Sequence, residues 1–119
     1  MTLSVVVAGA TGWTGRAVAE AVLDAEDLTL RAAVARSSAG GDLGEAWGGP
    51  PNGVPVLADV ATAVEGADVL VDYTSHDVVR QNVLAAISRG VHVVIGSSGL
   101  SGDDVAEIDS AARAAGVGV

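Results

Sequence analysis

Three glycines that directly follow a valine-rich run constrain the fold of this chain more than any other feature. Residues 7–16 read V-A-G-A-T-G-W-T-G-R, which places glycines at positions 9, 12 and 15 after the apolar run at 4–8. A strand that turns into a helix within a few residues needs a residue that adopts positive φ, and Gly9 supplies it. In such a turn Gly12 lets the backbone approach a pyrophosphate, and Gly15 lets the helix lie close to the strand. The N–H groups of the first helical turn would then hold phosphates without a cationic side chain.

The glycine spacing permits a nucleotide site but does not prove one. It is G-x-x-G-x-x-G rather than the plain G-x-G-x-x-G, and a glycine-rich turn can be only a turn. No G-K-S or G-K-T follows the glycines, so a P-loop triphosphatase lacks its phosphate lysine and its magnesium hydroxyl. The nucleotide interpretation therefore depends on the elements around the glycines.

Short β-branched runs alternate with stretches of helical period, a pattern typical of parallel strands joined by crossover helices. We predict strands at 3–8, 28–35, 55–57, 68–73 and 91–95, and helices at 13–25, 59–65 and 103–115. A further helix is expected between Ser75, as its cap, and Gly90, with Val79, Val83 and Ile87 on one face. The predicted fold class is α/β, a doubly wound and mostly parallel Rossmann-type sheet that forms one dinucleotide-binding domain over residues 1–119.

Finer expectations concern single segments. The helix at 13–25 is expected to bury Ala17, Val18, Ala21, Val22 and Ala25, which recur at helical spacing. Residues 37–53 hold S-S-A-G-G, G-G-P-P and N-G, which predicts a long, mobile surface loop. Ser101 and Asp104 resemble a capping box for the last helix, and residues 117–119 look like the start of another strand.

Composition excludes several classes of function. The 119 residues carry fifteen acidic and six basic side chains, a net charge of −9 that repels phosphate backbones, so we expect no nucleic-acid partner. There are no cysteines, which excludes disulfides and thiolate metal ligation, and we expect no metal. Because the sequence shows neither a secretory signal nor an apolar stretch near 20 residues, we expect no membrane association and a cytoplasmic protein.

The end of the second predicted strand bears on which dinucleotide would bind. Dinucleotide folds usually place an acidic residue there for the adenosine ribose, but this chain reads A-V-A-R-S-S, with Ala35 at that position. The missing carboxylate removes repulsion of a 2′-phosphate, and Arg36 and Ser37 add donors. We therefore expect NADPH to be preferred over NADH. The alternative is that Arg36 is an exposed loop arginine without a ligand.

Three segments together carry a family resemblance that covers essentially the whole chain. G-A-T-G-W-T-G-R, V-L-V-D-Y-T-S-H-D-V-V and G-V-H-V-V-I-G-S-S-G-L are similar, in this order and near this spacing, to the N-terminal domain of 4-hydroxy-tetrahydrodipicolinate reductase (dihydrodipicolinate reductase) of bacterial lysine and diaminopimelate biosynthesis. Tyr73, Ser97, Ser98 and Leu100 depart mildly from the family pattern. Ala35 is the one departure that puts equal use of NADH in doubt.

The resemblance implies roles for individual residues. It implies that the glycine loop wraps the pyrophosphate, that Arg36 meets the adenosine ribose or its phosphate, and that Ser98 also reaches a substrate carboxylate. The implied cofactor-binding set is Gly9, Ala10, Thr11, Gly12, Trp13, Thr14, Gly15, Arg36 and Ser37, with Asp72, Tyr73, Thr74, Ser75, Gly96, Ser97 and Ser98 on the nicotinamide half.

The resemblance also implies that part of the reductase is absent. In the family the segment that binds and protonates the substrate lies in a C-terminal domain, and nothing like it occurs here, so we expect no catalytic residue in this chain. We expect the chain to bind NADPH or NADH and to turn over little or no cyclic imine dicarboxylate, because hydride transfer needs the acceptor held in place. The family assembles as homo-oligomers mainly through that other domain, so a monomer is the expectation for this chain.

Two alternatives stay open at this point. One is a non-catalytic sensor or regulatory module that uses the same loop to bind NAD(P). The other is a partner chain that supplies the substrate residues at an interface. A short-chain-like reductase would need a Tyr-x-x-x-Lys pair, and the chain has no lysine.

Four other side chains stand out, and none of them is assigned a catalytic role. We expect His76 to be a solvated residue in the first turn of a helix and His92 to lie on a sheet face. Trp47 is expected to anchor the predicted surface loop at 37–53, in which it lies, rather than to stack on a base. Trp13 would either cover the cofactor or pack at the surface, which the sequence does not separate.

Overall fold

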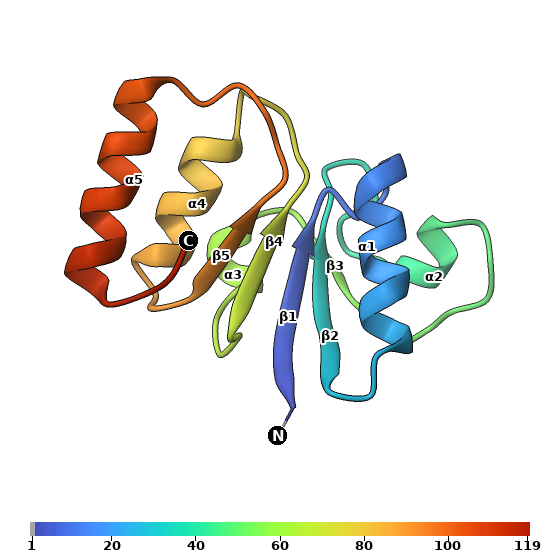
Figure 1. The fold of residues 1–119 in the computed structure, drawn as a ribbon. Helices are drawn as coiled ribbons and strands as arrows, with labels where there is room; N and C mark the ends of the chain where they lie inside the picture. Colours follow the sequence, from blue (N-terminus) through green and yellow to red (C-terminus); the bar gives the residue numbers. More distant parts are fainter. Residues whose placement is uncertain (1) are drawn as a thin grey trace.

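A five-stranded parallel sheet with helices on both faces forms the body of the protein. The computed structural model describes residues 2–119, and its strands lie in the order β3-β2-β1-β4-β5 (Figure 1). The strands are β1 (Leu3–Ala8), β2 (Leu28–Val34), β3 (Val56–Leu57), β4 (Val69–Asp72) and β5 (His92–Ile95). The helices are α1 (Trp13–Asp24), α2 (Leu43–Ala46), α3 (Val60–Ala63), α4 (Val79–Ile87) and α5 (Gly102–Ala115). The predicted doubly wound α/β fold is confirmed.

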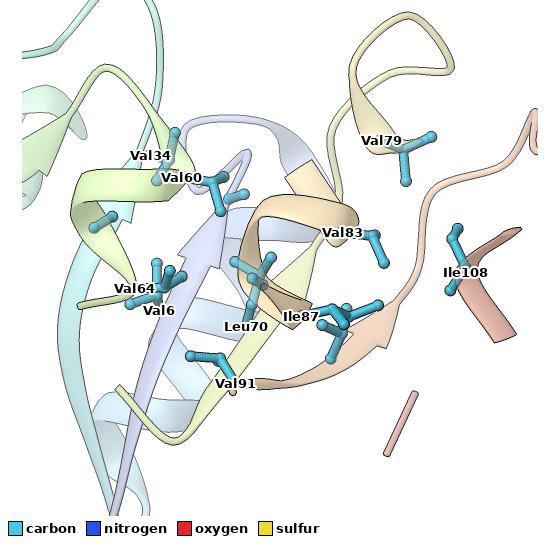
Figure 2. Close-up of a cluster of buried hydrophobic side chains, with 14 of the residues drawn as sticks. Val6, Val34, Val60, Val64, Leu70, Val79, Val83, Ile87, Val91 and Ile108 are labelled. Atoms are coloured by element: carbon cyan, nitrogen blue, oxygen red, sulfur yellow. The ribbon is translucent and has the colours of Figure 1, made fainter. Parts of the chain in front are cut away.

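Alternation along β1 divides the core into two layers. Val6 and Ala8 face the cluster built with α3, α4 and α5, whereas Val5 and Val7 face the cluster built with α1 and the segment around α2. Figure 2 shows the first cluster, in which Leu70 lies among side chains of β1 and α4. Because both faces are covered, the central strands are apolar on both sides, which explains their valine-rich composition.

Most predicted bounds lie within two residues of the observed ones, but the predicted buried face of α1 is only partly correct. Val22 is buried and Val18 packs against the core, as predicted, whereas Ala17 and Ala21 are exposed. The helix also buries Gly15 and Ala19, which the prediction left out. Gly15 lies against the backbone of Gly9, directly after β1. This contact determines which side of the helix faces the sheet. In an alanine-rich helix the apolar pattern does not distinguish one face from the next.

Two further predictions, both about the start of α4, are wrong. Ser75 does not cap α4, because residues 76–78 form a turn first and Val78 is the cap residue, without a side-chain cap. The Ser75 carbonyl accepts the N–H groups of Val78 and Val79 instead. His76 consequently lies in that turn and not in a first helical turn. The capping box of Ser101 and Asp104 on α5 is confirmed.

The segment predicted to be a loop at 37–53 contains the short helix α2. Asp42 caps it by accepting the Glu45 N–H, and Leu43 is fully buried. The same carboxylate accepts the N–H groups of Asn52 and Gly53, which closes the segment on itself. These contacts join residues ten or eleven positions apart, so no local period in the sequence announces them.

The segment that follows α5 runs along β5, the last strand of the sheet. Val93 of β5 donates its N–H to the Gly118 carbonyl, so residues 117–119 run beside β5 without being a strand of the sheet. His92 is exposed and its Nδ1 accepts the Gly118 N–H at 2.8 Å, as expected of a sheet-face histidine. Among residues 2–119, no helix has the length and apolar character needed to cross a membrane.

Substitution at Gly9 tests the packing of the β1–α1 turn. Gly9 has φ +84°, and a Cβ there would overlap the Tyr73 carbonyl, whereas Gly40 has φ +92° with nothing within 4 Å of an added Cβ. Both Gly9→Ala and Gly40→Ala strain the backbone, but only the first forces a clash. We expect Gly9→Ala to lower the free energy of unfolding in urea by about 2 kcal/mol more than Gly40→Ala. Equal losses would contradict the close approach.

Candidate functional site

A cleft of about 380 Å³ lies beyond the carboxyl ends of the first four strands. Ligands in doubly wound sheets collect at this edge. Five of the predicted site residues line it: Gly9, Thr11, Arg36, Thr74 and Ser75. Val34 and Ala35, at the end of β2, also line it. The sequence predictions missed the remaining lining residues, Ala58, Asp59, Val78, Gln81 and Asn82. Ala58 and Asp59 could have been found, because they directly follow the predicted strand at 55–57.

The other predicted residues do not line the cleft. Ala10, Gly15 and Asp72 are buried. Gly12, Trp13, Thr14 and Ser37 are exposed, and Trp13 is 98% exposed, so its indole does not pack on the protein surface. Tyr73, Gly96, Ser97 and Ser98 form the ends of β4 and β5. The predicted site is therefore one edge of the sheet with two parts, the cleft and the β4–β5 ends.

The three glycines of the loop meet three different environments. A Cβ on Gly9 would overlap the Tyr73 carbonyl, and a Cβ on Gly15 would overlap the Gly9 carbonyl, so the protein's own packing requires both. Gly12 has φ −79° and ψ 170°, which any residue adopts, and a Cβ there would meet only the Gly9 carbonyl oxygen, at 3.4 Å. Nothing in the protein therefore demands a glycine at position 12.

The N-terminus of α1 presents unused hydrogen-bond donors beside Gly12. The Gly12 N–H is bonded to the Gly9 carbonyl at 3.0 Å, and the first helical bond runs from the Arg16 N–H to the Gly12 carbonyl. Among residues 2–119, the N–H groups of Trp13, Thr14 and Gly15 have no acceptor, and α1 has no side-chain cap. Three parallel donors at the positive end of a twelve-residue helix suit an anion.

Asp72 ties the ends of β4 and β5 together from within. Its carboxylate is fully buried and accepts four hydrogen bonds. Oδ1 accepts the Thr74 N–H, the Thr74 hydroxyl and the Ser97 hydroxyl, at 3.1, 2.7 and 2.6 Å. Oδ2 accepts the Asn82 side-chain amide of α4 at 3.1 Å. The side chain therefore orients three polar residues of the site.

The ends of β4 and β5 also interlock through glycines. The Gly96 N–H bonds to the Asp72 carbonyl at 2.8 Å, and the Tyr73 ring occupies the space where a Cβ of Gly96 would lie. The His76 side chain lies equally close to Gly99. His76 itself is largely exposed and pairs with the neighbouring Asp77 at 3.1 Å, which fits a solvated histidine. The exposed Ser98 hydroxyl stands at the end of this surface.

Opposite charges line the cleft at its β2–β3 side. Arg36 forms no ion pair with another of residues 2–119, which leaves its guanidinium available to a ligand. Asp59 caps α3, and the Thr62 N–H that its carboxylate accepts at 2.8 Å holds the pKa of that carboxyl below its ordinary 3.8. Asp59 is therefore ionised at neutral pH. Within the described part of the chain, no three His, Cys, Asp or Glu residues cluster as a metal site would require.

Comparison with known proteins relates this edge of the sheet to one family. The family model described as dihydrodipicolinate reductase, N-terminus, matches residues 3–119. The 4-hydroxy-tetrahydrodipicolinate reductase of an Anaeromyxobacter species is 42% identical over 111 residues, which cover 92% of this chain and 41% of the relative. The enzyme of the same name from Chromobacterium violaceum is 37% identical over 98% of this chain and 45% of its own length. The chain thus spans less than half the length of these relatives.

Solved structures agree on the fold. A dipicolinate-bound dihydrodipicolinate reductase from a Paenisporosarcina species superposes with a TM-score of 0.83 at 23% identity, over 97% of this chain and 44% of the other. GenD2 from gentamicin A biosynthesis, solved in complex with NAD, gives a TM-score of 0.79 at 24% identity over 98% and 33%. At such identities these likenesses establish the Rossmann-type architecture alone.

Truncation of Asp72 tests whether its carboxylate organises the site. Asp72→Ala leaves the partly buried donors of Thr74, Ser97 and Asn82 without their acceptor, and should lower the free energy of unfolding by about 3 kcal/mol. Ser97→Ala removes one donor while the carboxylate keeps its other partners, and should cost about 1 kcal/mol. Urea unfolding measures both. A loss at Asp72 no greater than that at Ser97 would refute the central role of the carboxylate.

Proposed function

Since this chain belongs to the family of dihydrodipicolinate reductase N-terminal domains, we propose that its glycine loop and cleft bind a nicotinamide dinucleotide, with NADPH preferred over NADH. The pyrophosphate would lie on the N-terminus of α1, and the adenosine half in the cleft beside Arg36. The nicotinamide half would lie against the ends of β4 and β5, near Tyr73, Gly96 and Ser97.

Gly12 is the observation that carries this proposal. Gly9 and Gly15 are explained by packing within the protein, but a Cβ on Gly12 would make only an ordinary contact with the Gly9 carbonyl oxygen. Gly12 also lies next to three N–H groups that have no acceptor among residues 2–119. A glycine there has a purpose if a ligand backbone or phosphate occupies the space a side chain would take. The donor set consists of neutral N–H groups at a helix start, which fits a pyrophosphate in a chain of net charge −9.

The cleft supports the expected preference for NADPH through two residues. Ala35 lines the cleft where other dinucleotide folds carry an acid, and the neighbouring Arg36 forms no ion pair within residues 2–119. Arginine binds phosphate through a planar pair of donors. Asp59 acts in the opposite direction, because its ionised carboxylate lines the same cleft and repels a 2′-phosphate. The selectivity is then the balance of these two charges.

We further propose the reaction that this site serves. Bound nicotinamide would supply hydride to a cyclic imine dicarboxylate, 4-hydroxy-tetrahydrodipicolinate, in the cytoplasmic synthesis of diaminopimelate and lysine. Ser98 would offer its exposed hydroxyl to a substrate carboxylate. The groups that hold and protonate the substrate would belong to the part of the relatives that this chain does not match. The chain by itself would then be a monomer that binds cofactor with little turnover.

Gly12→Ala tests the pyrophosphate site directly. Because the backbone at Gly12 is ordinary and an added Cβ would contact only the Gly9 carbonyl oxygen, at 3.4 Å, the free energy of unfolding should fall by less than about 1 kcal/mol. The added methyl group should weaken NADPH binding at least tenfold, measured by calorimetry or nicotinamide fluorescence. Gly102→Ala is the control, since Gly102 is the first residue of α5, away from the cleft, and nothing lies within 4 Å of an added Cβ there. Unchanged affinity in Gly12→Ala, or no saturable binding by the unaltered chain, would sink the proposal.

Two variants of opposite sign test the ribose end. Arg36→Ala should weaken NADPH binding about tenfold or more and NADH binding much less, because only NADPH carries the 2′-phosphate. Asp59→Asn keeps a good helix cap but removes the negative charge, so it should tighten NADPH binding and leave NADH nearly unchanged. Separate titrations with the two cofactors give the ratio of dissociation constants. An Arg36 variant that loses both cofactors equally would speak against NADPH preference.

A further inference from the structure

Trp47, in the segment between β2 and β3, reaches the glycine loop from thirty-seven positions away. Its indole Nε1–H donates to the Ala10 carbonyl at 3.0 Å. Ala10 is fully buried, and the half-buried Trp47 ring packs against the same core cluster. The bond therefore joins the glycine loop to a part of the chain that belongs to neither β1 nor α1.

The Trp47 ring is held on several sides. Asp42 and Asn52 fix the segment around it, since Asn52 Oδ1 accepts the N–H groups of Gly44 and Val54 while Asp42 closes the turn. The Arg16 guanidinium of α1 lies over the ring, 5.0 Å from its centroid, and is itself paired with Glu20 at 2.7 Å. A ring restrained in this way can restrain the carbonyl that it binds.

Because a peptide group is planar, a restraint on the Ala10 carbonyl also fixes the direction of the Thr11 N–H. The described residues contain no cis peptide bond, and in a trans peptide the C=O of one residue and the N–H of the next point in opposite directions. The Ala10 carbonyl points to Trp47, so the Thr11 N–H points away from Trp47. Thr11 lines the cleft, and its N–H has no acceptor among residues 2–119.

We propose that Trp47 is a positioning residue for dinucleotide binding, which fixes the Ala10–Thr11 peptide so that the Thr11 N–H faces the phosphate site. This inference rests on the proposed dinucleotide site. It gives the segment around α2 a role in cofactor affinity, although none of its residues lines the cleft.

Trp47→Phe is the sharpest test, because it keeps an aromatic ring and removes the N–H. NADPH affinity should fall about fivefold, the equivalent of one hydrogen bond. Adenosine 2′-monophosphate lacks the pyrophosphate, so its weaker binding should not change. Ile87→Val is the control, because it trims the core on the opposite face of the sheet and should lower stability without changing either affinity. In the ligand-free chain, amide exchange of Gly12, whose N–H bonds to Gly9, should become faster in Trp47→Phe.

The outcomes separate this inference from the proposed function. If the unaltered chain binds NADPH and Trp47→Phe binds it equally well, or loses NADPH and adenosine 2′-monophosphate alike, the positioning role is wrong. If the unaltered chain binds no dinucleotide, the proposed function fails and Gly12 exchange decides. Faster exchange in Trp47→Phe would then still support control of the loop by Trp47, and unchanged exchange would overturn it.

Discussion

The close approach of three backbone segments at the β1–α1 turn is the contact on which the rest of the site depends. Gly9 leaves no room for a side chain beneath the Tyr73 carbonyl, and Gly15 leaves none beside the Gly9 carbonyl. β1, α1 and the end of β4 are therefore fixed against each other without any intervening side chain. This packing aims the start of α1 at the edge of the sheet, and it also sets which face of α1 is buried.

A second junction, of a different chemical kind, holds the neighbouring strand ends. The fully buried Asp72 carboxylate accepts hydrogen bonds from Thr74, Ser97 and Asn82, which are themselves partly buried. A buried carboxylate is costly unless its lone pairs are filled, and here each oxygen has a donor. The backbone junction and the carboxylate junction meet at the adjacent residues Asp72 and Tyr73, so the two parts of the site share one foundation.

The sequence predicts those features that local periodicity and local turn chemistry specify. The strands, α4, the α5 capping box and the positive φ at Gly9 all have short-range signals, and the structure confirms them. The α2 segment and the Trp47 bond depend on contacts ten to thirty-seven positions apart, for which a single sequence has no period. The place of Asp72 was foreseen as a strand end, but not its burial, because an aspartate after a strand has the same pattern whether it faces water or its neighbours.

The glycine motif shows why a pattern and its physical cause must be separated. Three glycines at equal spacing look equivalent in the sequence. Two of them, Gly9 and Gly15, are required by backbone packing and would be needed in a protein without any ligand. Of the three, only Gly12 lies where packing does not require a glycine, next to N–H groups that find no acceptor in the described part of the chain, residues 2–119. Evidence for a nucleotide therefore resides in one position rather than in the motif as a whole. The same distinction applies to Trp47, whose ring packs against the core while its Nε1–H donates to the Ala10 carbonyl of the glycine loop.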